Sequence, residues 1–445
     1  MTLSTAQKSQ KNVMDAFSKA GDLKKRILFT LVALVVFRFG TFIPLPGIDL
    51  ATFEAFFARN NDGLMGMFNT FAGGALSRMS LLALNIMPYI SASIIVQLGS
   101  AIFPALKALR KDEAGHRKMN QYTRYLTILI AIVQGYGMAV ALENMDGGSI
   151  VTMSSVALFR LTTVVSLLGG TLFVVWLGDQ ITSRGVGNGS SLIITAGIIA
   201  EVPRAFLQTL TQAREGSMSS ATLLIVCALI FALIYVVVFV ERAQRRIVVQ
   251  YPKGQMGTRS LSSKNSYFPL KINPTGVMPP IFASALLMLP LALMQFLADS
   301  SQSDTAKTIE LWLTRGGIGY MVTYALLIIF FTFFYTGVVF NPKETAENLK
   351  KNGGFIAGIR PGASTAEYLD YVMTRLTTLG AFYLATLCVL PEILISELAI
   401  PFVLGGTTLL IVVTVMMDTM TQIQSHLLAY QYESLIRKAH LKGRL

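Results

Sequence analysis

The chain has 445 residues, of which 53% are hydrophobic and only 14% are charged, and its net charge is +13. Soluble domains carry about 25% charged residues, so this composition excludes an ordinary soluble protein and indicates a membrane protein. Two cysteines within apolar segments and three scattered histidines leave too little material for a disulfide framework or a usual metal centre.

The first 26 residues are polar and lack a short apolar core followed by a cleavage site, so we expect no secretory signal peptide. Ten apolar segments follow, and each approaches the length of about 20 residues that a helix needs to cross a bilayer. Their unbroken runs favour helices over the strands of a barrel. The predicted spans are 27–43, 79–98, 123–142, 157–177, 190–209, 221–240, 276–297, 319–339, 372–391 and 401–418.

The fifth predicted span, 190–209, has the weakest signal because Glu201, Pro203 and Arg204 interrupt it. The distribution of positive charge supports this span. If all ten segments cross, most of the 37 Lys and Arg residues lie on one side, which the positive-inside rule identifies as cytoplasmic. Omitting the fifth span would place the basic 241–272 connection on the face opposite the first two basic regions. We therefore predict ten spans with both termini in the cytoplasm.

Ten spans divide into two sets of five, and an odd number in each half predicts two inverted halves related by a pseudo-two-fold axis in the membrane plane. The second half carries two basic loops, 241–275 and 341–371, that are longer than helix connections require. Their charge either sets the topology alone or docks an acidic partner, such as ribosomal RNA or an ATP-driven protein. The expected organisation is a cytoplasmic segment 1–26, a first half 27–209, a second half 210–418 and a cytoplasmic tail 419–445.

Between the first two spans lies a glycine-rich segment, 63–78, that is too short to cross the bilayer and is typical of a re-entrant or interfacial segment. Here the chain resembles the SecY family, the central channel subunits of the bacterial Sec translocon. The resemblance extends from about residue 20 to the C-terminus. The matching stretches are RFGTFIPLPG (38–47), FAGGALSR (71–78), MPYISAS (87–93), RGVGNG (184–189), GVMPPIFAS (276–284), FNPKETAENL (340–349), GIRPG (358–362) and QYES (431–434).

The resemblance implies an all-α integral membrane protein with ten transmembrane helices in two inverted halves of five around an hourglass pore, and a short plug helix. It also implies a ring of aliphatic side chains at the waist of the pore, which would seal an idle channel without a polar filter. Ser190 departs from the aliphatic pattern, so either the ring is looser there or a neighbour fills the gap. Without the resemblance, each isoleucine would be assigned to lipid contact or helix packing. The matching positions are Ile86, Ile90, Ser190, Ile194, Ile281 and Ile411.

The resemblance further identifies 64–78 as the plug, a short helix that closes the pore from the outer side; a poorly ordered periplasmic loop is the alternative. Glycines at 66, 73 and 74 lower helix stability by about 1 kcal/mol each relative to alanine, which suits a displaceable stopper. The plug residues are Phe68, Asn69, Phe71, Gly73, Gly74, Leu76 and Arg78.

A lateral gate between spans two and three and spans seven and eight is also implied. Its prolines remove backbone donors and permit bending. Asn85 and Gln97 either hydrogen-bond across the seam, at about 0.6 kcal/mol each, or are ordinary packing polar residues. The gate residues are Asn85, Pro88, Ser91, Gln97, Pro279, Pro280 and Pro290.

The two basic loops resemble those that dock the SecA motor or the ribosome. Arg360 matches the main docking position and would stand at a loop tip held by the rigid Pro361–Gly362 turn. Arg259 matches one arginine of a family pair whose other member is Thr258 here. The implied partners are the small membrane subunits SecE and SecG, SecA, the ribosome, signal peptides and unfolded preproteins, with SecDF and YidC as accessory proteins. The expected location is the bacterial inner membrane, with no cofactor and no enzymatic activity.

Two other classes of protein compete with a channel. A secondary transporter would need a polar or charged site near the bilayer midplane, and a membrane enzyme would need a nucleophile with a base or a metal cluster. The matched positions are aliphatic instead. Arg38 and Arg160, within or at the ends of spans, either snorkel or pair with carboxylates, for which Glu201 and Asp418 are the candidates.

Overall fold

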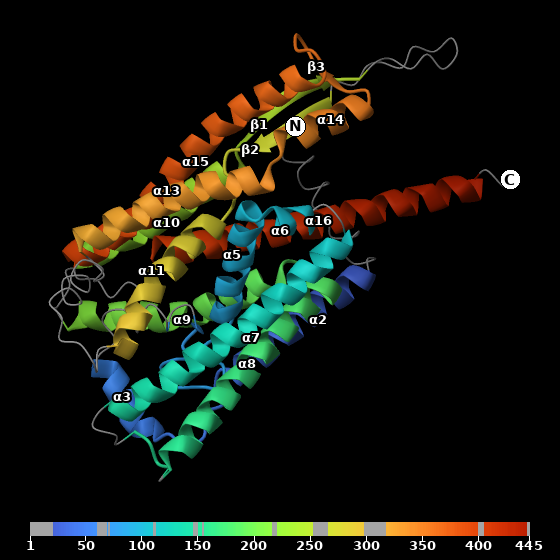
Figure 1. The fold of residues 1–445 in the computed structure, drawn as a ribbon. Helices are drawn as coiled ribbons and strands as arrows, with labels where there is room; N and C mark the ends of the chain where they lie inside the picture. The colour runs from blue at the N-terminus through green and yellow to red at the C-terminus, as the bar shows by residue number, and fades with distance from the viewer. Residues whose placement is uncertain are drawn as a thin grey trace, which may run out of the picture. The chain divides into compact units, whose positions relative to one another are not determined.

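The computed structural model describes residues 21–59, 69, 72–109, 113–145, 150–153, 155–215, 220–251, 266–297, 317–398 and 405–442 (Figure 1). The chain forms two compact units, and each is described by itself. The first comprises Met1–Phe206 and Ile411–Leu445, and the second comprises Leu207–Leu410. The chain from Ile411 onward therefore belongs to the first unit, whereas the sequence places residues up to 418 in the second half.

Each of the ten predicted spans coincides with a helix. Among the described residues, seven helices are long and apolar enough to cross a membrane, and two further ones, α5 and α11, are shorter and apolar. The chain is thus a multi-pass membrane protein. The ten helices are α2 Gly21–Gly40, α5 Met87–Ile102, α7 Glu113–Asn144, α8 Val156–Arg184, α9 Gly189–Arg214, α10 Ser220–Arg242, α11 Met278–Leu297, α13 Ile318–Val339, α15 Ala363–Leu398 and α16 Gly406–Lys442.

The fifth predicted span is confirmed as one continuous helix, α9, although Pro203 lies inside it. Its Gly189–Thr211 part has the length and hydropathy of a membrane span. Proline is tolerated inside such helices because neighbouring groups satisfy the backbone that it frees. Glu201, which interrupts the apolar run, is only 7% exposed. The acidic residue that weakens the hydropathy signal is therefore buried inside the protein.

The second predicted span begins later than expected. Residues 79–86 form turns, and α5 begins only at Met87. Met79 and Asn85 have φ angles of 39° and 48°, which are left-handed values that an α-helix cannot contain. Residues 73–79 are also turns, so a plug helix over 64–78 is wrong for that part. Of its earlier residues, Asn69 and Ala72 are helical, and the others lie outside the described ones.

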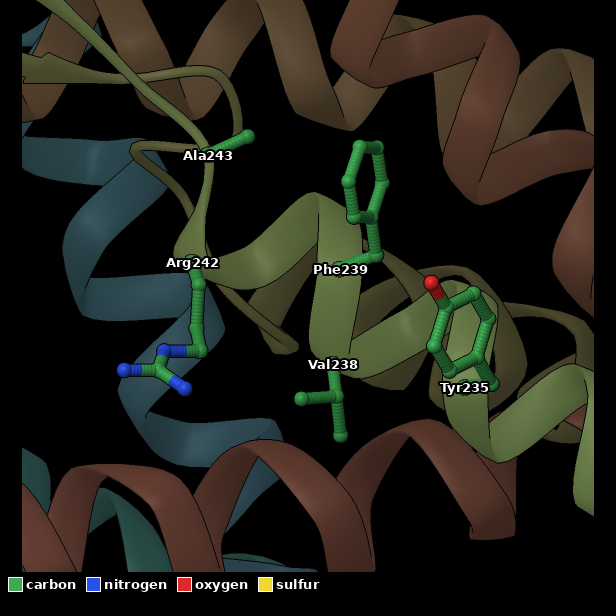
Figure 2. Close-up of a pocket in the computed structure, with 5 residues that line it drawn as sticks. All are labelled: Tyr235, Val238, Phe239, Arg242 and Ala243. Carbon is green, nitrogen blue, oxygen red and sulfur yellow. The ribbon is translucent and has the colours of Figure 1, made fainter. Parts of the chain in front are cut away.

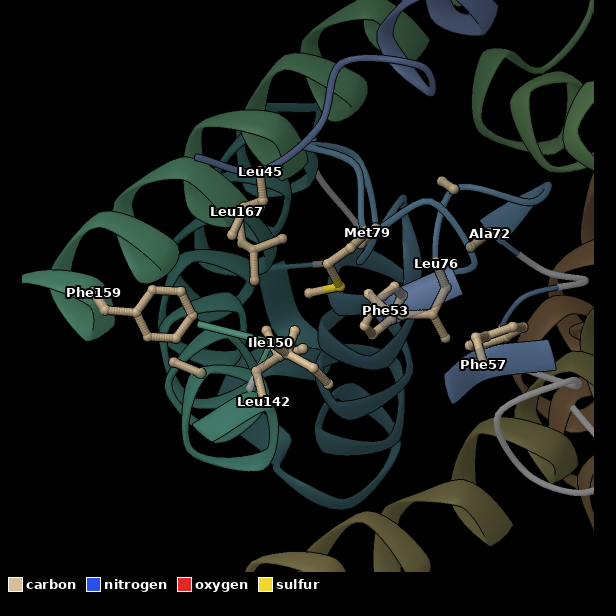
Figure 3. Close-up of a cluster of buried hydrophobic side chains, with 13 residues drawn as sticks. Leu45, Phe53, Phe57, Ala72, Leu76, Met79, Leu142, Ile150, Phe159 and Leu167 are labelled. Atoms are coloured by element: carbon tan, nitrogen blue, oxygen red, sulfur yellow. The ribbon is translucent and has the colours of Figure 1, made fainter. Parts of the chain in front are cut away.

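The first unit packs α7 against α5 and α8, and α2 against α8. A hydrophobic cluster joins α7 and α8 to the short helix α3 (Leu50–Arg59) and to the turns that precede α5 (Figure 3). Burial of this cluster anchors the turns, because each fully buried large apolar side chain stabilises the fold by about 1.5–3 kcal/mol. Its members are Leu45, Phe53, Phe57, Ala72, Ala75, Leu76, Met79, Ala83, Ala139, Leu142, Ile150, Phe159 and Leu167.

The second unit packs α13 against α11 and α15, and it adds a feature that an all-α prediction misses. Strands β1 (Gln244–Gln250), β2 (Ser266–Lys271) and β3 (Phe355–Ile356) form an antiparallel sheet in the order β2-β1-β3. Gln244 pairs with Lys271, and Val249 pairs with Ile356. Helix α14 (Pro342–Lys351) packs on α15. The two long loops are thus joined into one structure.

Candidate functional site

The loop of residues 72–86, which precedes α5, is held inside the first unit by backbone pairing. The amide of Leu45 donates to the carbonyl of Met79 at 2.9 Å, and the amide of Leu81 donates to Ile43 at 2.8 Å. A bridge joins Pro44 to Ser80. These bonds satisfy backbone groups that would otherwise be unpaired in an apolar interior. Whether this segment is re-entrant or interfacial in the membrane stays a prediction.

Arg38, in the last turn of α2, connects this loop to α9. Its Nη1 donates to the carbonyl oxygen of Gly73 at 2.6 Å. Its Nη2 lies 3.9 Å from Oε1 of Glu201, and the two side chains are 28% and 8% exposed respectively. Of the two alternatives for Arg38, pairing with a carboxylate is therefore the observed one.

Two glycines of the loop touch α9 directly. A Cβ on Gly73 would lie 2.5 Å from Cα of Gly197, and one on Gly74 would meet the carboxylate of Glu201. Both glycines have left-handed φ angles, 65° and 77°. Only glycine combines this conformation with so close a backbone approach. Their predicted role as helix-weakening residues is thus replaced by a specific contact with α9.

The loop also carries its own hydrogen bonds. The side-chain oxygen of Asn69 accepts from the amide of Ser77 at 2.9 Å, and its carbonyl accepts from the amide of Gly74 at 2.9 Å. The hydroxyl of Ser77 donates to the carbonyl of Gly74 at 2.9 Å. All three bonds join residues within 69–77, so they fix the local shape of this segment.

Four of the predicted plug residues therefore lie in this loop, and a fifth, Asn69, bonds to it. Leu76 is buried in the cluster of Figure 3, and the guanidinium of Arg78 lies 4.3 Å from the centre of the Phe42 ring. Arg38 lies 5.1 Å from the same ring. Asn69, Gly73 and Gly74 make the contacts given above. The other two plug residues, Phe68 and Phe71, lie outside the described residues.

Four of the six predicted ring positions are buried: Ile86, Ile194, Ile281 and Ile411 are between 1% and 7% exposed. Ile90 and Ser190 are half-buried. Ser190 and Ile194 lie one turn apart on α9, so they share a face of that helix. A single ring stays a prediction, since Ile281 belongs to the second unit and the others to the first.

Ser190 has a local role that its departure from the aliphatic pattern does not reveal. It lies in the first turn of α9, and its hydroxyl donates to Oδ1 of Asn188 at 2.7 Å. The same Asn188 oxygen accepts from the amide of Ser190 at 3.2 Å. This arrangement caps the helix N-terminus, whose first amides lack partners within the helix.

The predicted gate prolines need a correction. Pro88 lies in the first turn of α5, and Pro279 and Pro280 lie in the first turn of α11. A proline there removes no helical hydrogen bond, because those amides have no partner within the helix. These three prolines start helices instead of bending them. Only Pro290 lies in the interior of α11, and its side chain is outside the described residues.

The polar gate residues lie on or just before α5. The amide of Gln97 donates to the hydroxyl of Ser93 at 3.1 Å, so this bond stays within α5 and does not cross a seam. Asn85 is 1% exposed in the turn before the helix, and Ser91 is half-buried within it. Hydrogen bonding across the gate therefore stays a prediction for Asn85 and Gln97.

The two basic loops form a structure that we call the platform, consisting of β1, β2, β3, α14 and the first part of α15. Apolar residues from each of these elements share one core beneath it. Such a core holds a charged surface in a fixed shape, which is how loops on a rigid scaffold carry recognition residues. The fully buried members are Ile247, Leu270, Ala346, Ile356, Ala366, Leu369, Val372, Met373 and Leu376.

Arg360 lies in the turn between β3 and α15, and its side chain is exposed. Its carbonyl accepts a hydrogen bond from the hydroxyl of Thr365 at 2.9 Å. Gly362 has a φ of 114° and its carbonyl accepts from the amide of Ala366 at 3.1 Å. Pro361 and Gly362 thus begin α15 and fix the backbone that presents Arg360. Arg259 lies outside the described residues.

Sequence reasoning missed a buried polar junction at the base of the platform. The side-chain amide of Asn273 donates to Glu241 at 2.7 Å and to the carbonyl of Gly276 at 3.0 Å. The hydroxyl of Thr275 donates to Asn273 at 2.8 Å. The sequence does show a carboxylate at the end of α10 and a polar stretch at 273–276. It does not show that these two segments, about 30 residues apart, contact each other.

A second ion pair lies elsewhere in the first unit. Arg160 on α8 pairs with Glu143 on α7 at 2.7 Å, and the two side chains are 37% and 14% exposed. Its Nε also donates to Oε1 of Glu143 at 3.0 Å. Pairing thus applies to Arg160 as well, although its partner is neither of the predicted acids.

A hollow beside the end of α10 is lined by Tyr235, Val238, Phe239, Arg242 and Ala243 (Figure 2). Tyr235 and Phe239 stack with ring centres 6.4 Å apart. A small-molecule site needs several polar groups that converge on the ligand. This lining is mainly apolar, so it gives a transporter no support.

Taken together, the long apolar helices define a multi-pass helical membrane protein, with a buried loop packed on α9 and a platform of strands and helices. Solved structures agree on the fold. A structure described as a protein conducting channel matches with a TM-score of 0.69 and 16% identity, covering 92% of this chain and 93% of that one. Sec61 in the canine ribosome–channel complex from the endoplasmic reticulum matches with a TM-score of 0.65 and 16% identity, with the same coverage.

Sequence comparison identifies the family. The SecY family model matches residues 80–420. The protein translocase subunit SecY of Escherichia coli (strain K12) is 50% identical over 424 residues, which cover 95% of this chain and 96% of that protein. The same subunit of Vibrio cholerae serotype O1 is 49% identical over 442 residues, with coverages of 98% and 99%. The chain belongs to the SecY family.

Proposed function

We propose that this chain is the channel-forming subunit of a translocase in the bacterial inner membrane. It passes unfolded secretory polypeptides across the bilayer and releases transmembrane segments sideways into lipid. The observation that carries this proposal is the buried loop of residues 72–86, which packs inside the first unit and reaches α5 through turns over residues 73–86. A removable segment of this kind suits a channel that must close when idle.

The closed pore is sealed by the isoleucines and the loop together. Translocated chains carry side chains of every chemistry, so the seal has to be independent of sequence. Aliphatic side chains provide such a seal because they exclude water and offer ions no ligands. The burial of Ile86, Ile194, Ile281 and Ile411 supports this role. The relatives named as translocase subunits support it independently.

The platform docks the partner that drives transport, either the SecA motor or a translating ribosome. Its exposed Arg360 provides a fixed positive charge, and Arg245 and Arg246 are exposed on the same structure. Cationic side chains bind phosphates and carboxylates. One fold neighbour is a ribosome–channel complex, which supports a ribosome as an alternative partner. SecE and SecG complete the membrane complex.

The platform and both termini face the cytoplasm in this proposal. The basic residues Lys24, Lys25 and Arg26 begin α2, and Arg242 ends α10 immediately before β1. Cytoplasmic connections are enriched in such residues. Opposite orientation would place the platform where neither motor nor ribosome can reach it.

Reconstitution tests the proposed function. The purified protein, with SecE, SecG and SecA in lipid vesicles, is given an unfolded secretory precursor and ATP. We expect the precursor to become protected from added protease, and omission of ATP to abolish protection. Uptake of a small solute without any protection of the precursor would favour a transporter and overturn the proposal.

A further inference from the structure

The loop of residues 72–86 closes over a charge. Glu201, in the middle of α9, is 7% exposed, and Gly74 packs directly on its carboxylate. A buried carboxylate is costly unless it is paired, because the apolar surroundings replace the water that would solvate it. The closed loop therefore needs a cation at this position.

Arg38 is that cation, and it reaches both sides of the contact. One guanidinium nitrogen lies 3.9 Å from Glu201, while another donates to Gly73 of the loop at 2.6 Å. The side chain of Arg38 is itself 28% exposed. A single side chain thus neutralises the acid beneath the loop and holds the backbone above it.

Glu201 and Gly197 lie one turn apart on α9, so they form one surface of that helix. The loop lays Gly73 on Gly197 and Gly74 on Glu201. Displacement of the loop would expose the carboxylate to water, which favours the displaced state. Two contributions therefore oppose each other: the Arg38 contacts stabilise the closed loop, and hydration of Glu201 stabilises the displaced loop.

We propose that Arg38 and Glu201 form an electrostatic latch, in which Arg38 is the positioning residue that keeps the plug loop closed and Glu201 is the buried charge that makes closure conditional on it. This inference rests on the proposed function, because it assumes that the loop is the stopper. It assigns to Arg38 and Glu201 the role of setting the free energy needed to displace the plug loop.

The latch predicts that a second substitution partly reverses the leak caused by the first. Unspecific structural damage would instead increase the leak with each substitution. Arg38→Gln leaves the carboxylate of Glu201 buried and unpaired, so the closed state is destabilised. Adding Glu201→Gln removes that buried charge, so the double variant Arg38→Gln/Glu201→Gln is closed more often than Arg38→Gln alone. Two independent structural defects would add instead. Arg38→Lys keeps the positive charge and restores most of the seal.

The test measures ion conductance of the purified complex in planar bilayers without a translocating substrate. Arg38→Gln should raise the conductance about tenfold or more, which corresponds to about 1.4 kcal/mol. The double variant and Arg38→Lys should lie closer to wild type. Arg160→Gln is the matched control, because it breaks an arginine–glutamate pair of the first unit that does not involve the loop, and it should leave the conductance unchanged. Size-exclusion chromatography in detergent confirms that each variant is folded.

Wild-type conductance in folded Arg38→Gln would overturn the latch, and so would a double variant at least as leaky as Arg38→Gln. A variant that lacks residues 64–78 separates the latch from the stopper. If the deletion variant leaks while Arg38→Gln does not, the loop is the stopper but Arg38 and Glu201 do not form a latch. If neither variant leaks, both the plug role of the loop and the latch are wrong.

Discussion

The side-chain amide of Asn273 donates a 2.7 Å hydrogen bond to the carboxylate of Glu241, and both side chains are buried. This bond ties the end of α10 to the residues that follow β2. The strand hairpin between them is therefore anchored at its base as well as through its apolar core.

Asn273→Ala should lower the stability of the platform by about 1–3 kcal/mol, because hydrogen bonds to charged groups contribute that much and the carboxylate stays buried. Limited proteolysis of the 244–271 region measures the effect. Asn352→Ala, at an exposed position after α14, is the control and should be cleaved at the wild-type rate. Equal protection of Asn273→Ala and wild type would show that the junction is not structural.

Arg360→Glu should block transport while the protein stays folded and inserted, because the substitution reverses a fixed charge at the docking surface. Protease protection of a precursor in vesicles measures transport. Lys351→Glu makes the same change of charge in the last turn of α14 and should have a much smaller effect. Wild-type transport in Arg360→Glu would refute the docking role.

Gly74→Ala should make the closed channel leak, because the added methyl group would meet the carboxylate of Glu201. It also strains a left-handed backbone, which costs about 1–2 kcal/mol for a residue with a Cβ. Gly358→Ala separates the two effects, since Gly358 has a φ of 83° but no atom near its added Cβ. We expect Gly358→Ala to conduct like wild type in planar bilayers. If Gly358→Ala and Gly74→Ala leak equally, the leak of Gly74→Ala results from backbone strain and not from contact with Glu201.

Ile194→Asn should raise the idle ion conductance, since an amide in an aliphatic seal holds water and lowers the barrier to ions. Ile199→Asn, at a position of the same helix that is 42% exposed, is the matched control for the change of residue. A seal that is insensitive to Ile194→Asn would remove this residue from the ring.

The helices were predictable because a membrane demands long apolar runs and internal backbone bonding, and charge distribution recovered α9 despite Glu201 and Pro203. The strands were not, because β1 and β2 are short, polar on one side and stabilised by residues of α14 and α15 that lie far away in the chain. The same limit applies to the latch. Arg38 and Glu201 were both recognisable as charges within spans, but their pairing across the loop depends on tertiary packing.

The glycines and prolines show a second limit. Both residue types indicate an interrupted helix, and the sequence alone does not distinguish a bend from an end. Pro88 and Pro279 begin helices, whereas Pro203 lies inside one. Gly73 and Gly74 end helical geometry altogether. Whether a proline bends a helix or begins it depends on its position relative to the first helical turn, and only the structure gives that position.

The central claim is that the loop of residues 72–86 must leave α9 before a polypeptide can pass. A reversible crosslink tests it most directly, with Gly74→Cys and Glu201→Cys in a background that lacks Cys227 and Cys388. The carboxyl group of Glu201 packs on Gly74, so the two positions are neighbours across the contact between the loop and α9. Loss of both free thiols on oxidation shows that the disulfide has formed. Oxidation should abolish ATP-driven protection of a precursor, and reductant should restore it. Undiminished transport through the fully crosslinked protein would contradict the claim.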